Sequence, residues 1–165
     1  MQTPPTSPEY KVSSVEGLPF LQGGMKAICF LEHKENKFVN AKTMFSKSKD
    51  DVQKAIRYGI QQWLQGVPAP KRHHGWNQSQ HGGAYTNCYV FKHVAKGVRF
   101  YGCLHHPVAN GRALICCVIH YAIKREDEVD TYILDDINQF LAKDEFKAAL
   151  EGFWNELQSK QGDVQ

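Results

Sequence analysis

Apolar positions along the chain predict strands and helices in the order β, α, β, β, β, α, α. Continuous or alternating apolar runs are typical of strands, whereas apolar spacings of three and four are typical of helices. This order predicts an α+β fold in which helices pack on a small antiparallel sheet of three to four strands. The predicted strands cover residues 26–33, 84–93, 98–105 and 112–121, and the predicted helices cover residues 52–64, 130–141 and 144–157.

The last three predicted strands are joined by short connections. Residues 94–97 form one loop, and Pro107 and Gly111 lie in the next. Because short loops join antiparallel neighbours, these three strands are expected to be adjacent and antiparallel. The third of them is apolar on both faces from Leu114 to Ile119, which is typical of a central strand.

The first predicted helix has clear boundary signals. Ser48 is a candidate N-cap, and Asp50 and Asp51 favour the first turn because they complement the positive end of the helix dipole. Gly66 ends the helix, and the polar, glycine-rich stretch 67–83 that follows is predicted to be a long loop.

The length of 165 residues fits one domain. Prolines and small polar residues predict a disordered N-terminal tail at residues 1–15, followed by a single α+β domain at residues 16–160. No apolar stretch approaches the about 20 residues of a membrane-spanning helix, and the N-terminal sequence lacks the features of a secretory signal. We therefore expect a cytoplasmic protein with no membrane partner.

The five cysteines all fall in apolar, strand-like runs. No pair of them has the CxxC spacing that is typical of zinc ribbons. The pattern predicts reduced cysteines buried in the core, as is usual in cytoplasmic proteins.

Charge is distributed unevenly along the chain. The formal net charge is only +3, but the stretch from Lys71 to Arg125 contains no acidic residue and holds most of the histidines. This stretch is therefore a candidate anion-binding region.

A cluster of basic and aromatic residues in the predicted loop is the first candidate site. Cations and imidazoles beside an indole are suited to binding phosphate and stacking a base. The alternative is a solvated basic loop whose indole fills the edge of the core. The residues of this cluster are Lys71, Arg72, His73, His74 and Trp76.

Strand alternation predicts a second candidate site. Arg99 and Tyr101 share a face of strand 98–105, where an arginine can hold a phosphate through two hydrogen bonds. His120 ends the next apolar strand and is followed by Lys124 and Arg125, as expected for a general acid or base. His120 is expected to share a face with Leu114, Cys116 and Val118; its alternative role is a satisfied histidine at a sheet edge.

From residue 52 to residue 141 the chain resembles the RelE/HigB-like toxins of bacterial toxin–antitoxin systems. The resemblance covers the element order and three local patterns: the segment Pro-Lys-Arg-His-His-Gly (70–75) after the first helix, the strand at 96–101, and the strand at 113–125 that leads through His120 into a basic segment.

The resemblance implies a RelE-like fold and a metal-independent endoribonuclease. In such an enzyme the 2′-hydroxyl of mRNA attacks the neighbouring phosphate, and no cofactor is needed. The implied partners are RNA or the ribosome, together with a possible small antitoxin protein. By this resemblance Arg99 and Lys124 would bind the phosphate, His120 or the pair His73 and His74 would move protons, and Lys71 and Arg72 would hold the RNA backbone.

Two other interpretations remain open. One is a non-catalytic module of phage or plasmid origin that binds nucleic acid or protein through the same basic face and the amphipathic C-terminal helix. The other is a metal-dependent enzyme built on a cluster of His73, His74, His81, His105 and His106, although none of these has a helical metal-binding spacing.

Overall fold

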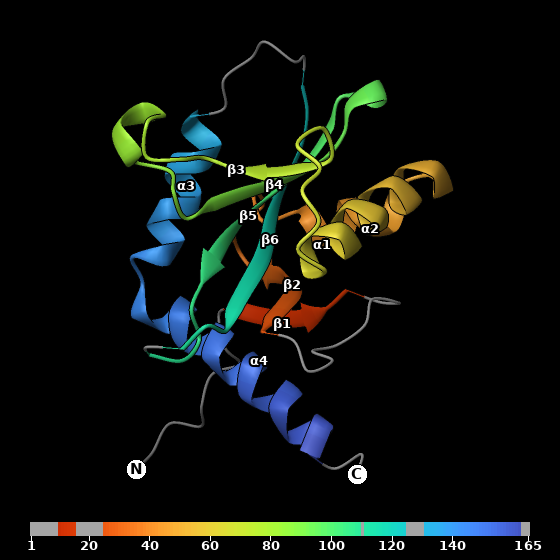
Figure 1. Cartoon of the computed structure of the whole chain (residues 1–165). Helices are drawn as coiled ribbons and strands as arrows, with labels where there is room; N and C mark the ends of the chain where they lie inside the picture. The colour runs from red at the N-terminus through yellow and green to blue at the C-terminus, as the bar shows by residue number, and fades with distance from the viewer. Residues whose placement is uncertain (1–9, 16–24, 110, 125–130, 163–165) are drawn as a thin grey trace.

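The chain forms a mixed sheet with helices on both of its faces (Figure 1). The computed structural model describes residues 10–15, 25–109, 111–124 and 131–162. The strands are β1 (Tyr10–Ser14), β2 (Lys26–His33), β3 (His73–Gly75), β4 (Cys88–His93), β5 (Val98–His105) and β6 (Leu114–Ile123), and the helices are α1 (Ala41–Lys47), α2 (Asp50–Leu64), α3 (Thr131–Leu141) and α4 (Asp144–Gly162).

The sheet has six strands in the order β1-β2-β6-β5-β4-β3. Strands β4, β5 and β6 are antiparallel neighbours, as their short connections predicted. The expectation of a small, RelE-like antiparallel sheet of three to four strands is wrong, because the sheet has six strands and β2 runs parallel to β6. The α+β class itself is correct.

Two edge strands account for most of this difference. Strand β1 lies in what was predicted to be the disordered tail, and β3 lies in what was predicted to be a loop. Both are short, and each pairs with a single neighbour, so their sequences lack the long apolar run of a central strand. The expected disorder of residues 1–9 lies outside the described residues.

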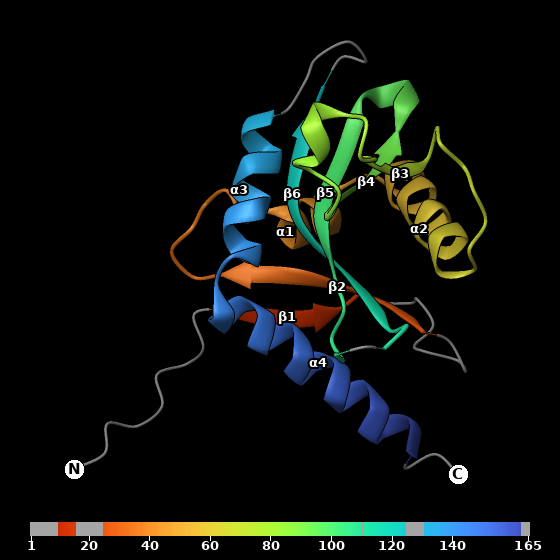
Figure 2. The same cartoon turned by 60° about the vertical axis from the view of Figure 1, so that its left-hand side comes forward.

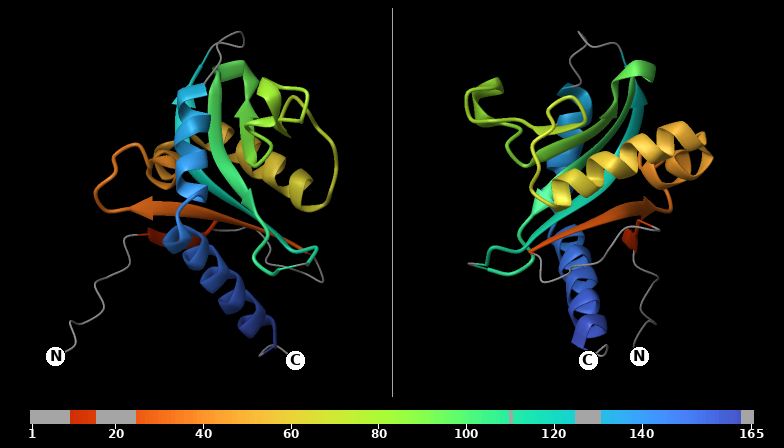
Figure 3. Two further views of the ribbon diagram at one scale, coloured as in Figure 1. Left: turned by 90° about the vertical axis from the view of Figure 1, so that its left-hand side faces the viewer. Right: turned by 45° about the vertical axis from the view of Figure 1, so that its right-hand side comes forward.

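The helices between the strands make the parallel pairing possible. A parallel partner needs a long crossover, and α1 and α2 lie between β2 and the strands that follow. They cover one face of the sheet, while α3 and α4 cover the other (Figure 2). Figure 3 shows the same arrangement from two further sides.

The boundary between α1 and α2 differs from the prediction in one respect. Ser48 was expected to cap the start of α2, but its hydroxyl donates to the Met44 carbonyl at 2.7 Å and its backbone amide donates to Phe45. Ser48 is therefore the C-cap of α1, and Lys49 is at the N-cap position of α2. The acidic first turn of α2, Asp50 and Asp51, is present as expected.

A β-bulge interrupts the pairing of β5 and β6. Tyr101 pairs with His120, but Gly102 pairs with Val118, so Ile119 is the extra residue. The bulge reverses the alternation of side chains beyond it. His120 therefore does not share a face with Val118, as alternation had predicted, but reaches α3 on the opposite face.

All five cysteines are buried and unpaired, as expected. Burial raises the pKa of Cys88 to about 12 and the pKa values of Cys116 and Cys117 well above their usual range. These thiols are consequently protonated packing groups rather than nucleophiles. In the part of the chain that the structure describes, no helix is long and apolar enough to cross a membrane.

Candidate functional site

A row of four residues crosses the sheet on the face that α3 covers. Register places His74 beside Val90, Val90 beside Tyr101, and Tyr101 beside His120. Val90 and Tyr101 belong to the core on the α3 side. Strands β3 to β6 thus place two histidines and a tyrosine that are distant in the sequence in one row across the sheet.

A second row lies beside the first and carries positive charge. Arg99 on β5 pairs with Lys92 on β4 and with Ala122 on β6. Arg99 and Tyr101 point to the same face, because they are two positions apart on one strand. Arg99 and His120 are diagonal neighbours across β5 and β6, a relation that typically separates backbone positions by about 7–8 Å.

Arg99 is the unusual member of this row. Its side chain is buried, with the residue only 8% exposed, and its Nη1 atom has no hydrogen-bond partner among the described residues. No carboxylate forms an ion pair with it in that part of the chain. Because a buried cation without a counter-charge is costly, this guanidinium is suited to receiving an anion from outside the protein.

His74 lies close to this cation and is neutral at pH 7. Burial lowers its pKa, and the positive charges of Lys92 and Arg99 lower it further, while the Gly75 carbonyl opposes the shift. Its Nδ1 is 3.0 Å from the Gly75 oxygen, which can only accept a hydrogen bond. The proton of the neutral ring therefore lies on Nδ1, and Nε2 has a lone pair with which it can accept a proton.

Aromatic rings connect His74 to Tyr101. Trp76 stacks on Tyr101 at a centroid distance of 6.4 Å and meets His74 edge-on at 5.2 Å. Burial raises the pKa of Tyr101 to about 12, so its hydroxyl is protonated at neutral pH. The Trp76 indole therefore fills the edge of the core, as one of the two interpretations of the loop predicted.

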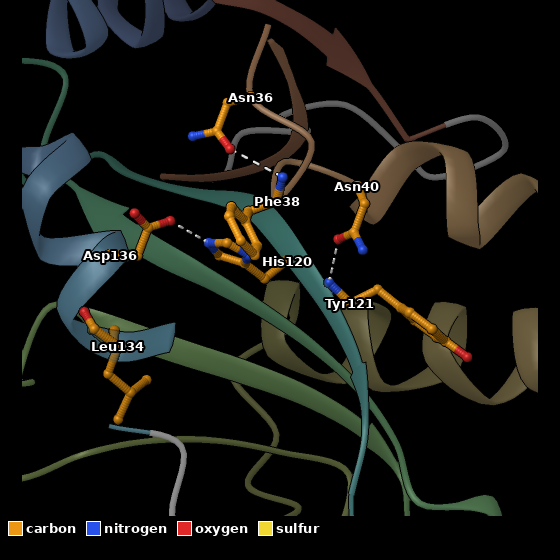
Figure 4. Close-up of polar contacts among 8 residues, drawn as sticks. Asn36, Phe38, Asn40, His120, Tyr121, Leu134 and Asp136 are labelled. Atoms are coloured by element: carbon orange, nitrogen blue, oxygen red, sulfur yellow. Dashed lines mark hydrogen bonds and ion pairs between the residues drawn. The ribbon is translucent and has the colours of Figure 1, made fainter. Parts of the chain in front are cut away.

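His120 forms a close pair with Asp136 of α3 (Figure 4). The distance from Nε2 to the carboxylate Oδ2 is 2.7 Å, and the histidine is buried. Burial lowers the pKa of His120, whereas Asp136 and the backbone of Phe38 oppose that shift. Sequence reasoning missed Asp136 because it is one of two adjacent carboxylates on an amphipathic helix, where nothing distinguishes it from a solvent-exposed carboxylate.

A pocket of about 290 Å³ opens beside this pair. Its lining is mostly apolar and comes from the segment before α1, from β6 and from α3. The lining residues are Phe38, Asn40, His120, Tyr121, Ala122, Tyr132, Ile133 and Asp136.

The fold separates His73 from the candidate site. Its ring lies on the α2 face, where Nε2 is 2.9 Å from the Val67 oxygen and Nδ1 is 2.7 Å from the Tyr89 hydroxyl. Both ring nitrogens therefore have structural partners, and the ring also stacks on Tyr89. Of the two adjacent histidines, His74 alone lies on the same face of the sheet as Arg99.

The remaining cations lie around the edge of the sheet. Lys71 and Arg72 are exposed, and the Arg72 guanidinium lies over the ring of Tyr58 on α2 at 4.5 Å. Lys124 follows the end of β6, where its backbone amide donates to Gly97. Arg125 lies outside the described residues.

The histidines do not gather into a metal site. His106 bonds through Nδ1 to the Ala113 carbonyl at 2.9 Å, and His105 lies near Glu151 of α4. Within the described ranges, no three histidine, cysteine or carboxylate side chains are close enough to share a metal ion.

Comparisons with family models, with curated proteins and with solved structures find no match to this chain. The resemblance to RelE/HigB-like toxins therefore stays a prediction, and the site must be interpreted from its own geometry.

Acidification from about pH 7 to about pH 5 is expected to lower the melting temperature. Burial lowers the pKa values of His73, His74, His105 and His120 from the ordinary 6.5. The unfolded chain takes up protons near pH 6.5 while these folded histidines resist protonation. Stability present above pH 6.5 is therefore lost as the pH falls toward the folded-state pKa values. Thermal melts at constant ionic strength measure this, and an unchanged or higher melting temperature at pH 5 would contradict it.

Proposed function

We propose that the chain is an endoribonuclease that cleaves RNA without a metal ion, through attack of a ribose 2′-hydroxyl on the adjacent phosphate. The observation that carries the proposal is the buried guanidinium of Arg99, which has no acidic partner among the described residues and shares its face of the sheet with His120 on β6 and His74 on β3. An RNA phosphate has the charge and the geometry that such a guanidinium binds best.

Each step of the reaction has a candidate group in the two rows. Arg99 binds the phosphate and stabilises the charge that builds up on its oxygens. His74 takes the proton of the 2′-hydroxyl on Nε2, which suits a neutral imidazole whose Nδ1 proton is already engaged. The 5′-oxygen would leave with a proton from the charged form of His120, which Asp136 favours although burial makes it the minor form at neutral pH.

The proposal predicts that His74→Gln slows RNA cleavage about 10²- to 10⁴-fold, which is the usual contribution of a general base. The measurement is cleavage of a labelled RNA by the purified full chain in the presence of EDTA, with the products tested for 2′,3′-cyclic phosphate ends. His93→Gln is the matched control, because His93 lies on β4 and alternation points it to the opposite face from Lys92. This control is expected to cleave at the wild-type rate.

The outcomes are distinct. Cleavage with cyclic phosphate ends that depends on His74 but not on His93 supports the proposal. A wild-type protein that binds RNA without cleaving it contradicts the proposal and favours the non-catalytic binding module. Cleavage that EDTA abolishes contradicts the metal-independent mechanism.

A further inference from the structure

The pocket beside His120 lies where β2 stops pairing with β6. Pairing between these strands ends at Phe30 and Val118, although β6 continues to Ile123. Beyond Val118, Asn40 forms hydrogen bonds with the backbone of β6. Its backbone amide donates to the Ile119 oxygen at 3.1 Å, and its side-chain Oδ1 accepts from the Tyr121 amide at 2.8 Å (Figure 4). The space between this segment and α3 is the pocket.

Two exposed aromatic rings border the pocket. Phe38 is 71% exposed and Tyr132 is 68% exposed, and both contribute to the lining. They come from different parts of the chain, the segment before α1 and the first turn of α3. Single exposed aromatic residues are common, but a pair that borders one pocket offers a stacking surface for a flat ring.

The polar atoms of the pocket complement the edge of a nucleobase. Because the Oδ1 of Asn40 accepts from Tyr121, its Nδ2 group is the donor that remains for a ligand. Asp136 uses Oδ2 for His120, so Oδ1 remains as an acceptor. Nucleobases present a donor and an acceptor side by side on their pairing edge, which matches one carboxylate oxygen and one amide nitrogen.

We propose that this pocket binds a nucleobase of the RNA beside the cleaved phosphate, with Phe38 and Tyr132 as stacking groups and Asn40 and Asp136 as edge-reading groups. The inference rests on the proposed function for the identity of the substrate. It extends that function by assigning sequence preference to a site one strand away from Arg99.

The test is a titration of the full chain with the four ribonucleosides, followed by nuclear magnetic resonance. Nucleosides carry no phosphate, so Arg99 does not contribute to their binding, and ribose alone is the negative control. Phe38→Leu and Tyr132→Leu remove a ring and keep apolar surface, and each is expected to weaken binding about five- to hundredfold. Phe38→Tyr and Tyr132→Phe keep the ring and should bind as the wild type does.

A further variant tests the edge-reading groups. Asn40→Asp keeps an oxygen to accept from the Tyr121 amide but replaces the amide donor with an acceptor. It is expected to change the order of preference among the four nucleosides, and thermal melts check that the variant folds.

Binding of at least one nucleoside that depends on the rings supports the inference, even if RNA is not cleaved. Failure of all four nucleosides to bind overturns it, even if RNA is cleaved, and so does equal binding by the ring-free variants. The proposed function and this inference can therefore fail separately.

Discussion

Arg99→Met is expected to slow RNA cleavage strongly while leaving the protein at least as stable as the wild type. Loss of one oriented cation from the transition state should slow the reaction about 10²- to 10³-fold. Stability should not fall, because methionine fills the volume of the side chain and removes a buried charge that has no acidic partner in the part of the chain that the structure describes. We expect an increase in the free energy of unfolding on the order of 1 kcal/mol.

A loss of activity without a loss of stability distinguishes a cation that binds the substrate from one that stabilises the fold. If Arg99 were a structural residue, its replacement would lower the melting temperature together with activity. Added inorganic phosphate should raise the melting temperature of the wild type but not that of Arg99→Met, because only the wild type has the anion site. Arg112→Met, which removes an exposed cation before β6, is the matched control. It should change neither the cleavage rate nor the rise in melting temperature with phosphate.

An Arg99→Met variant that cleaves RNA at the wild-type rate would show that this guanidinium does not contact the reacting phosphate. A large loss of stability would show that Arg99 has a structural partner and would remove the main support for an anion site.

Gly102→Ala is expected to cause the largest loss of stability, about 3 kcal/mol. A Cβ atom at this position would overlap the backbone of β6, namely the carbonyl of Cys117 and the Cα of Val118. Backbone atoms in the centre of a sheet cannot move aside cheaply, so the bulge would have to open or the strands would have to separate. Chemical denaturation of the purified variant measures the change.

Gly152→Ala is the control for this substitution. Gly152 lies on an exposed position of α4, and an added Cβ meets no atom within 4 Å. Alanine should stabilise the helix there by about 0.5–1 kcal/mol. If Gly102→Ala were no more harmful than Gly152→Ala, the tight contact at the bulge would be contradicted.

Much of the local structure could be predicted from the sequence. Helical spacing placed α2 within two residues of its observed start, because apolar positions at 52, 56, 60 and 63 leave one buried stripe. Short connections determined that β4, β5 and β6 are adjacent and antiparallel. Alternation along β5 also placed Arg99 and Tyr101 on one face, because a strand without a bulge has a strict period of two.

Other features depended on contacts between distant segments. The edge strands β1 and β3 pair with one neighbour each, and their sequences carry too few apolar residues to predict them. The parallel pairing of β2 with β6 depends on how the crossover through α1 and α2 folds back, which no local pattern encodes.

The face of the sheet on which His120 lies depends on contacts between β5 and β6. Alternation predicted that His120 shares a face with Val118. Because of the bulge at Ile119, His120 instead lies on the face that α3 covers, where it pairs with Asp136. The bulge forms where Gly102 lets two backbones approach, so its position depends on β5 and β6 together. Side chains alternate between the two faces only where each residue has one partner on the neighbouring strand. Whether this holds depends on both strands together, so the sequence of one strand does not predict it.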